Sequence, residues 1–202
     1  MPKPERGVLL VLAGTSGAGK GTVGARLRAS DPDLHWSVSW TTRPRRPDEV
    51  EGVDYHYVSR DEFERLRDAS GFLEWFEVYG DLKGTPKHFV LDELAAGRDV
   101  MLEVDVQGAM AVKRALPEDA LLVFVKAPSR EEQRRRLEGR ARETGEGPES
   151  IDRRLAAAAT EERIAETEFD AVVVNDDVDR AAAQIADILT NRRTAGRHPQ
   201  GA

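Results

Sequence analysis

Residues 7–22 of the chain are GVLLVLAGTSGAGKGT, an apolar run that passes directly into a glycine-rich turn. The run over residues 7–13 is short, continuous and rich in branched side chains, which predicts a buried strand. A helix over residues 19–29 is expected to begin directly after the turn. This order of elements favours anion binding, because a helix N-terminus and inward-facing backbone N–H groups attract phosphate oxygens.

The turn matches the Walker pattern of Gly, four residues, Gly-Lys and then Ser or Thr, except at its last position. Gly14, Gly19 and Lys20 fit, whereas Gly21 stands where the hydroxyl is usually found and Thr22 follows it. Lys20 is expected to reach the β and γ oxygens of ATP. Mg²⁺ would then be held by Thr22, or through water and substrate phosphates. The predicted ATP-binding residues of the loop are Gly14, Thr15, Ser16, Gly17, Ala18, Gly19, Lys20, Gly21 and Thr22.

The rest of the chain alternates predicted strands and helices. Further strands are expected at residues 37–42, 99–106, 120–125 and 171–175, and helices at 60–69, 86–96, 107–115, 130–142, 149–166 and 178–191. Residues 72–85 are aromatic and turn-rich without a clean period, and residues 192–202 are expected to be frayed. The alternation predicts one α/β domain of three layers with a mainly parallel sheet, its core formed by about residues 7–35, 98–128 and 168–191.

Composition narrows the classes of function. The chain has 30 Lys+Arg against 37 Asp+Glu, a formal net charge of −7, which argues against duplex nucleic acid as a partner but allows a local cationic pocket. The absence of cysteine excludes disulfide-linked partners, thiolate zinc sites and cysteine nucleophiles. The apolar run at residues 8–13 is far shorter than the ~20 residues of a membrane span, and no signal peptide is recognisable. We therefore expect a cytoplasmic protein that acts without a membrane.

A second group of phosphate-binding side chains lies in residues 39–55. Arg43, Arg45 and Arg46 fall within four residues, and Tyr55 follows them. Forked guanidinium donors with one hydroxyl suit a phosphomonoester, although a solvated basic loop would have the same composition. Residues 39–55 are therefore a candidate site for a phosphomonoester, in addition to the nucleotide loop.

With these residues in view, the chain resembles the guanylate kinase family over about residues 7–191. The resemblance implies a P-loop core, an inserted GMP-binding region over about residues 36–90 and a helical lid over about 134–160. Six motifs in the family's order carry it, and they stand at residues 39–46, 49–55, 72–74, 103–108, 135–140 with Arg154, and 174–177.

The resemblance implies ATP-dependent phosphorylation of GMP to GDP, with ATP and GMP as partners and Mg²⁺ as cofactor. It implies that the GMP phosphate is held by Ser39, Arg43, Arg46 and Tyr55, and that guanine is recognised by Glu74, Thr85 and Asp105. A carboxylate accepts from both N1–H and the exocyclic amine of guanine, whereas adenine presents an acceptor there. Lys83 replaces a family tyrosine that touches the phosphate, and lysine can make that contact as a point charge.

On the donor side, the resemblance assigns Arg136, Arg140 and Arg154 to the lid over ATP and Asn175 to the adenine edge. Stabilisation of the transferred phosphoryl group is implied for Lys20, Arg43, Arg140 and Arg154. Glu103 stands two residues before Asp105 and is expected to share its side of the strand. We therefore regard Glu103, with Thr22, as a candidate metal contact, the carboxylate acting through water.

Two alternatives remain at this point. One is a guanylate-kinase-like module that binds protein without catalysing, against which Lys20 and the loop glycines stand. The other is a kinase of the same fold with a different phosphorylated acceptor, such as ribose 1,5-bisphosphate. Lys83 favours that second alternative, whereas Glu74 and Asp105 favour GMP.

Overall fold

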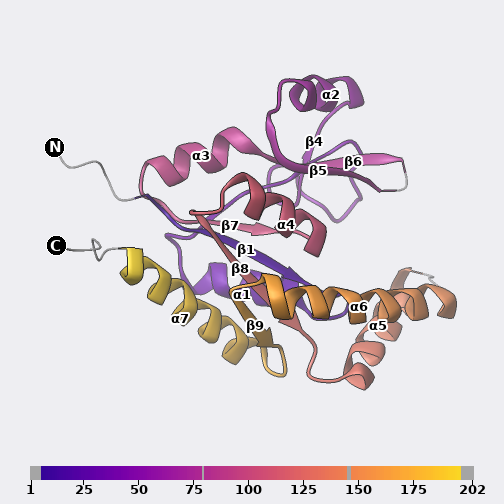
Figure 1. Cartoon of the computed structure of the whole chain (residues 1–202). Coiled ribbons are helices and arrows are strands. Elements are labelled where there is room, and N and C mark those ends of the chain that lie inside the picture. Colours follow the sequence, from indigo (N-terminus) through magenta and orange to yellow (C-terminus); the bar gives the residue numbers. More distant parts are fainter. Residues whose placement is uncertain (1–5, 79, 145–146, 197–202) are drawn as a thin grey trace.

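The central layer of the structure is a parallel sheet. The computed structural model describes residues 6–78, 80–144 and 147–196 of the chain (Figure 1). The larger sheet has the strand order β2-β7-β1-β8-β9, and every neighbouring pair in it is parallel. Its strands are β1 (Leu9–Gly14), β2 (His35–Trp36), β7 (Val100–Glu103), β8 (Ala120–Lys126) and β9 (Ala171–Val174). The predicted α/β class with a mainly parallel sheet is confirmed.

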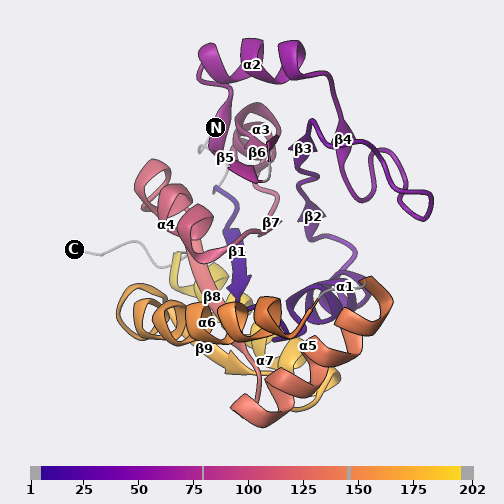
Figure 2. The same cartoon turned by 90° about the vertical axis from the view of Figure 1, so that its right-hand side faces the viewer.

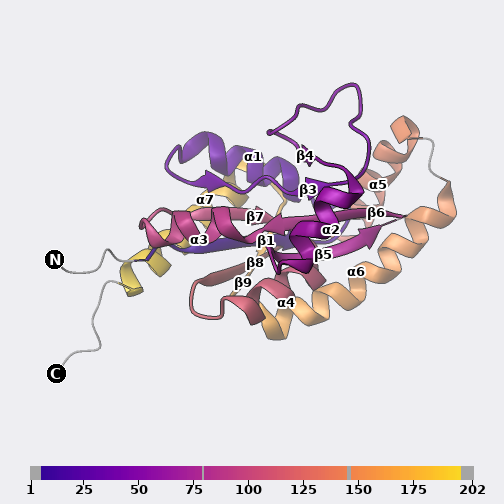
Figure 3. The same cartoon turned by 90° about the horizontal axis from the view of Figure 1, so that it is seen from above.

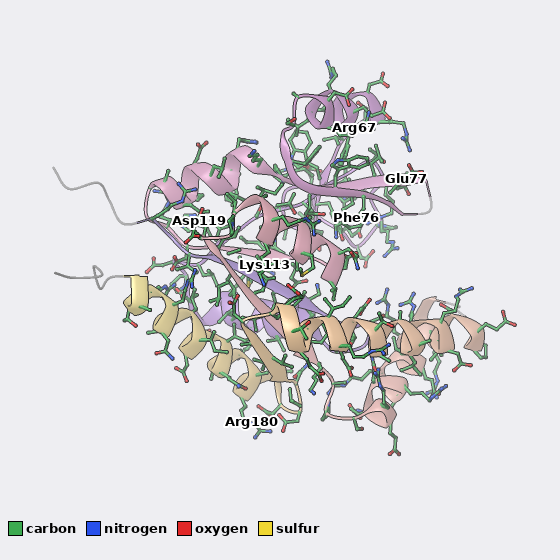
Figure 4. All side chains as sticks on the ribbon, in the orientation of Figure 1. Arg67, Phe76, Glu77, Lys113, Asp119 and Arg180 are labelled. Atoms are coloured by element: carbon green, nitrogen blue, oxygen red, sulfur yellow. The ribbon has the colours of Figure 1, made fainter. Side chains whose placement is uncertain are left out.

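Helices cover both faces of this sheet. Side chains alternate along β1, so that Leu10 and Leu12 pack with α1 and α7, whereas Leu9 and Val11 pack with α3, α4 and α6. These helices are α1 (Lys20–Ser30), α3 (Lys87–Ala95), α4 (Val106–Ala115), α6 (Pro148–Glu168) and α7 (Val178–Gly196). Figure 4 shows Lys113 between α4 and α6, where it donates to the carbonyl of Glu168. The expected three layers are therefore present.

A second, smaller sheet was not predicted from the sequence. Its order is β4-β3-β6-β5, and β5 and β6 form an antiparallel hairpin. Helix α2 (Arg60–Asp68) covers one face through Phe63, which stacks on Phe72 and is fully buried. The strands are β3 (Trp40–Thr41), β4 (His56–Tyr57), β5 (Phe72–Val78) and β6 (Asp81–Pro86).

Three predicted boundaries are wrong by three residues or more, one of them the end of the strand expected over residues 99–106, which stops at Glu103. The strand expected over residues 37–42 is reduced to β3, because Trp36 belongs to the larger sheet and the chain crosses to the second sheet after it. Helix α7 continues to Gly196, five residues past its predicted end, because Arg193 is anchored by ion pairs to Asp31 and Asp99. Residues 197–202 of the predicted tail lie outside the described residues.

The second sheet and helix α5 (Arg130–Thr144) project from the same end of the core. This end lies opposite the start of β1 and the end of α7 (Figures 1 and 3). Figure 2 looks at this end and shows the second sheet with α2 on one side and α5 with α6 on the other. Among the described residues, no helix is long and apolar enough to cross a membrane.

Candidate functional site

The glycine-rich loop connects β1 to α1 and lines a cavity of about 510 Å³. Gly14 ends the strand, and Gly19 stands just before the helix with φ of 80°. Gly17 also has a left-handed φ, of 82°, so both positions need the conformational freedom of glycine. The cavity is lined by Gly14, Thr15, Ser16, Gly17, Gly19, Lys20, Gly21, Thr22, Arg136, Leu137 and Arg140. Strand, turn and helix thus stand where the sequence predicts them.

Asn175 supports this loop from the end of β9. Its side-chain Nδ2 donates to Ala18 O at 2.7 Å, and the residue is only 2% exposed. Arg136 reaches the same carbonyl with Nη1 at 3.2 Å and the carbonyl of Asn175 with Nη2 at 3.0 Å. A β-carbon at Gly19 would lie 2.4 Å from Asn175 Nδ2, so glycine is also required for this close approach. The adenine contact expected of Asn175 stays a prediction, and the contact observed is with the loop.

Lys20 forms an ion pair with Glu103 at the mouth of the loop. The distance from Nζ to Oε2 is 3.1 Å, and both side chains are about one-fifth exposed. Glu103 lies against α1 where Gly24 leaves room, since a β-carbon there would stand 2.4 Å from Glu103 Oε1. A phosphate arriving in the loop would compete with Glu103 for the ammonium group of Lys20.

Glu103 and Asp105 do not share a strand, and this prediction is wrong. Strand β7 ends at Glu103, and Asp105 is the N-cap of α4, where its Oδ1 accepts from Gly108 N at 2.7 Å. The turn into the helix sends the two carboxylates to different places. Glu103 faces α1. Asp105 lies near Glu74, both of them beside Gly108, since a β-carbon on that glycine would lie within 3.4 Å of a carboxylate oxygen of each.

The donor set fits a Mg²⁺ ion held mostly by substrate phosphates and water. Within the described residues, no group of three or more His, Cys, Asp or Glu side chains could hold a metal by itself. Glu103 supplies one carboxylate beside the loop, and Thr22 supplies a hydroxyl from the loop lining. Mg²⁺ commonly takes one or two carboxylates and completes its shell with phosphates and water, so this sparse set is adequate.

Glu74 presents a buried carboxylate from β5. The residue is 6% exposed, its Oε1 accepts from Thr85 Oγ1 at 2.6 Å, and its Oε2 is buried with no hydrogen-bond partner among the described residues. Burial raises the pKa of this carboxyl, and the nearby Asp105 adds to the rise, against the hydrogen bond from Thr85 and the charge of Lys83. A buried oxygen without a donor is costly, so Oε2 is suited to a ligand that brings one.

The arginine-rich loop is organised by Glu49. Its Oε1 accepts from Arg43 Nη2 at 2.6 Å, and its Oε2 accepts from Arg46 N and from the Tyr57 hydroxyl, both at 2.8 Å. The Arg43 guanidinium is the main cause that lowers the pKa of the Glu49 carboxyl to about 2. Glu49 belongs to the motif at residues 49–55, but the sequence did not identify Glu49 or Tyr57 as site residues. Their partners come together only through the turns of this loop.

Lys83 and Tyr55 stand together beside Arg43. Lys83 Nζ donates to the Tyr55 hydroxyl at 3.2 Å and lies 4.8 Å from the ring centroid. The Arg43 guanidinium lies 5.6 Å from the same ring. Ser39 lies at the start of β3, where its carbonyl accepts from His56 N at 2.9 Å. The structure thus brings Arg43, Tyr55 and Lys83 together, while the Arg46 side chain is exposed.

Three predicted lid arginines lie at the phosphate loop. Arg154, near the start of α6, donates from Nη1 to Ser16 Oγ at 3.1 Å. Arg136 and Arg140 line the loop cavity from α5. Glu132 accepts from Arg136 Nε at 2.7 Å and holds that guanidinium in place. Gln133, one residue further along α5, also contacts the loop, and no sequence pattern singled it out.

The chain is similar in sequence to several proteins named guanylate kinase. The family model for guanylate kinase matches residues 6–192. A guanylate kinase of Rubrobacter xylanophilus is 50% identical over 195 residues, covering 96% of this chain and 99% of that protein. One of Thermus thermophilus is 49% identical over 196 residues, covering 96% and 85%. The crystal structure of a guanylate kinase from Anaplasma phagocytophilum has a TM-score of 0.74 at 33% identity, covering 96% of this chain and 88% of that one.

Proposed function

Since this chain belongs to the guanylate kinase family, we propose which of its residues carry out that family's reaction, the ATP-dependent phosphorylation of GMP to GDP. Phosphoryl transfer needs little covalent chemistry from the protein, and catalysis rests on placing two substrates and stabilising the charge that moves between them. The residues therefore form three groups. The donor side binds ATP, the acceptor side binds GMP, and cationic side chains stabilise the phosphoryl group between them.

On the donor side, the loop at residues 14–22 binds the phosphates of ATP. Its backbone N–H groups and the N-terminus of α1 supply positive potential, and Lys20 exchanges Glu103 for phosphate oxygens. Arg136 and Arg140 cover the phosphates from α5. Asn175 and Arg136 hold the loop through Ala18 O, and the assignment of Asn175 to adenine remains a prediction.

On the acceptor side, Glu74, Thr85 and Asp105 recognise guanine. The N1–H and amine of the base give Glu74 Oε2 the donor that it lacks, and Thr85 fixes the other oxygen of the carboxylate. The GMP phosphate lies against Arg43, Arg46, Tyr55 and Lys83, with Ser39 at the start of β3. Because Glu49 already pairs with Arg43, the arginine is oriented before the phosphate arrives.

Cationic side chains stabilise the phosphoryl group as it moves from ATP to GMP, and they are Lys20, Arg43, Arg140 and Arg154. Closure of the protein over the two substrates excludes water, which would compete with GMP as acceptor. Thr22 and Glu103, together with substrate phosphates and water, would hold the Mg²⁺ that accompanies ATP, and the ion would neutralise phosphate charge. A cytoplasmic location is part of this proposal.

The assignment of GMP as acceptor rests on the buried carboxylate of Glu74, whose Oε2 has no hydrogen-bond partner among the described residues. An acceptor screen with Mg·ATP tests it, using GMP, dGMP, AMP, UMP and ribose 1,5-bisphosphate with the intact chain. We expect GMP to be phosphorylated with kcat/KM at least ~10⁴ times that of AMP, because a site built on hydrogen bonds rejects the wrong base strongly. Faster turnover of ribose 1,5-bisphosphate than of GMP would overturn the assignment.

A further inference from the structure

Gln133 is a buried amide that lies directly behind the phosphate loop. It is 1% exposed, and its Nε2 donates to Thr15 Oγ1 at 3.0 Å and to Ser16 O at 2.8 Å. Its Oε1 accepts from Arg130 Nη1 at 2.8 Å. Arginine has only donors, so this contact decides which end of the amide faces the loop.

The loop itself creates the need for such a donor. A backbone that turns its N–H groups toward an anion leaves its carbonyls facing the protein, where each needs a hydrogen-bond partner. Ala18 O receives Asn175 and Arg136, and Ser16 O receives Gln133. Gln133 therefore supplies the amide donor to Ser16 O, whereas Asn175 supplies the one to Ala18 O.

Ser16 is held from both helices of the lid region. Gln133 of α5 binds its carbonyl, and Arg154 of α6 binds its hydroxyl. The two helices are also joined to each other, because Arg130 Nη2 of α5 pairs with Glu162 of α6 at 3.1 Å while its Nη1 holds Gln133. A shift of α5 would thus reach Ser16 directly through the Gln133 side chain.

We propose that Gln133 is a positioning residue that sets the shape of the phosphate loop for ATP through Thr15 and Ser16. The proposal rests on the proposed function in that the loop is taken as the ATP site. A side chain that only filled space would be replaceable by an apolar one of the same length. Gln133 instead uses both amide groups, so its replacement leaves a buried carbonyl and hydroxyl without their donor.

The test compares Gln133→Met with Glu131→Met in the full chain. Methionine keeps the length of the side chain and removes the donors of Gln133, and the control makes the same substitution at an exposed residue of the same helix. We expect Gln133→Met to weaken binding of a non-hydrolysable ATP analogue about tenfold, measured by calorimetry, with KM for ATP rising in step. KM for GMP should change by less than about twofold, and the control should change none of the three.

Unchanged affinity for the analogue, or an equal rise in both KM values, would overturn the proposal. Analogue binding needs no turnover, so this outcome is distinct from a failure to phosphorylate GMP. Should the methionine variant not fold, Gln133→Glu keeps the length and the contact with Arg130 but loses the donors. Its carboxylate would face Ser16 O, and we expect a larger loss of analogue affinity than for methionine. A folded Gln133→Glu that binds the analogue like the unsubstituted chain would equally reject the proposal.

Discussion

The two phosphate-binding regions of the molecule are held by different kinds of contact. The loop at residues 14–22 is supported by two buried neutral amides, Gln133 and Asn175, in addition to the guanidinium groups of Arg136 and Arg154. The arginine-rich loop is supported by the charged pair of Arg43 and Glu49, at a partly exposed position. Neutral buried hydrogen bonds are insensitive to salt, whereas a partly exposed ion pair is screened by it. The amide contacts behind the loop should therefore tolerate changes of salt that weaken the pair of Arg43 and Glu49.

The largest effect is expected on the donor side, from Lys20→Ala. This change removes the cation that acts on the phosphate oxygens, and kcat should fall by at least ~10²–10³-fold. Lys113→Ala is the matched control, because it also breaks a lysine–glutamate pair, that with Glu168, away from the loop. Steady-state kinetics and thermal melts of both variants check this. Near-normal kcat in Lys20→Ala would remove the basis for assigning the loop to phosphoryl transfer.

On the acceptor side, Glu49→Gln should raise KM for GMP by about tenfold, equivalent to ~1.4 kcal/mol. The amide keeps acceptor capacity for Tyr57 but no longer orients Arg43 by charge. Glu49 has a lowered pKa, so its contribution to stability is present above the ordinary pKa of 4.5 and is lost as pH falls toward about 2. Kinetics against ATP and GMP separately test this, and an equal rise in both KM values would argue for general disorder.

A smaller effect is expected on thermal stability, because the pKa of Glu74 is raised whereas that of Glu49 is lowered. Burial raises the pKa of Glu74, so the carboxyl favours folding below its unfolded pKa and loses that contribution as pH rises through its folded pKa. Glu74→Gln removes the buried charge, and its Tm should exceed that of the unsubstituted chain by a few degrees at pH 8 and by less at pH 5. Melting curves at both pH values provide the measurement. A difference in Tm that shrinks as pH rises would contradict the burial of a charged carboxylate.

The smallest effect is expected from Lys83→Tyr. The ammonium adds a charge to the group formed with Tyr55 and Arg43, and partly exposed charges are screened within a Debye length of ~10 Å at 0.1 M salt. The tyrosine variant should show a weaker salt dependence of KM for GMP, with kcat changed by less than about tenfold. Plots of KM against salt for both forms decide the matter. Identical slopes would show that Lys83 does not act on the phosphate.

The sequence predicted the donor side better than the acceptor side for a physical reason. Strand, glycine turn and helix at residues 7–29 depend on neighbouring residues, so local pattern is sufficient for them. Strand β5 has a bulge between Phe72 and Glu74, so that Phe72 lies on the face covered by α2 and Glu74 on the face of the site, and this irregularity hides the strand period. Asp105 was placed in a strand because its apolar neighbours continue past Glu103, whereas its side chain caps α4.

Contacts between distant segments explain what else was missed. Gln133 meets Thr15 across more than a hundred residues of sequence, and the Glu103 carboxylate occupies the space beside Gly24. Such pairs leave no periodic trace in a single sequence. The family's motifs named the arginines and carboxylates of the site, but they could not show which partners hold them.

The most direct test of the account is the preference for guanine over adenine with and without the Glu74 carboxylate. The ratio of kcat/KM for GMP to that for AMP is measured for the unsubstituted chain and for Glu74→Gln, with ATP as donor. We predict that the ratio falls by at least ~10²-fold in the variant, because the amide no longer offers guanine a charged acceptor in the place of Oε2. KM for ATP should stay the same. A ratio that is unchanged in a folded, active Glu74→Gln variant would contradict the account, since the buried carboxylate would then not recognise the base.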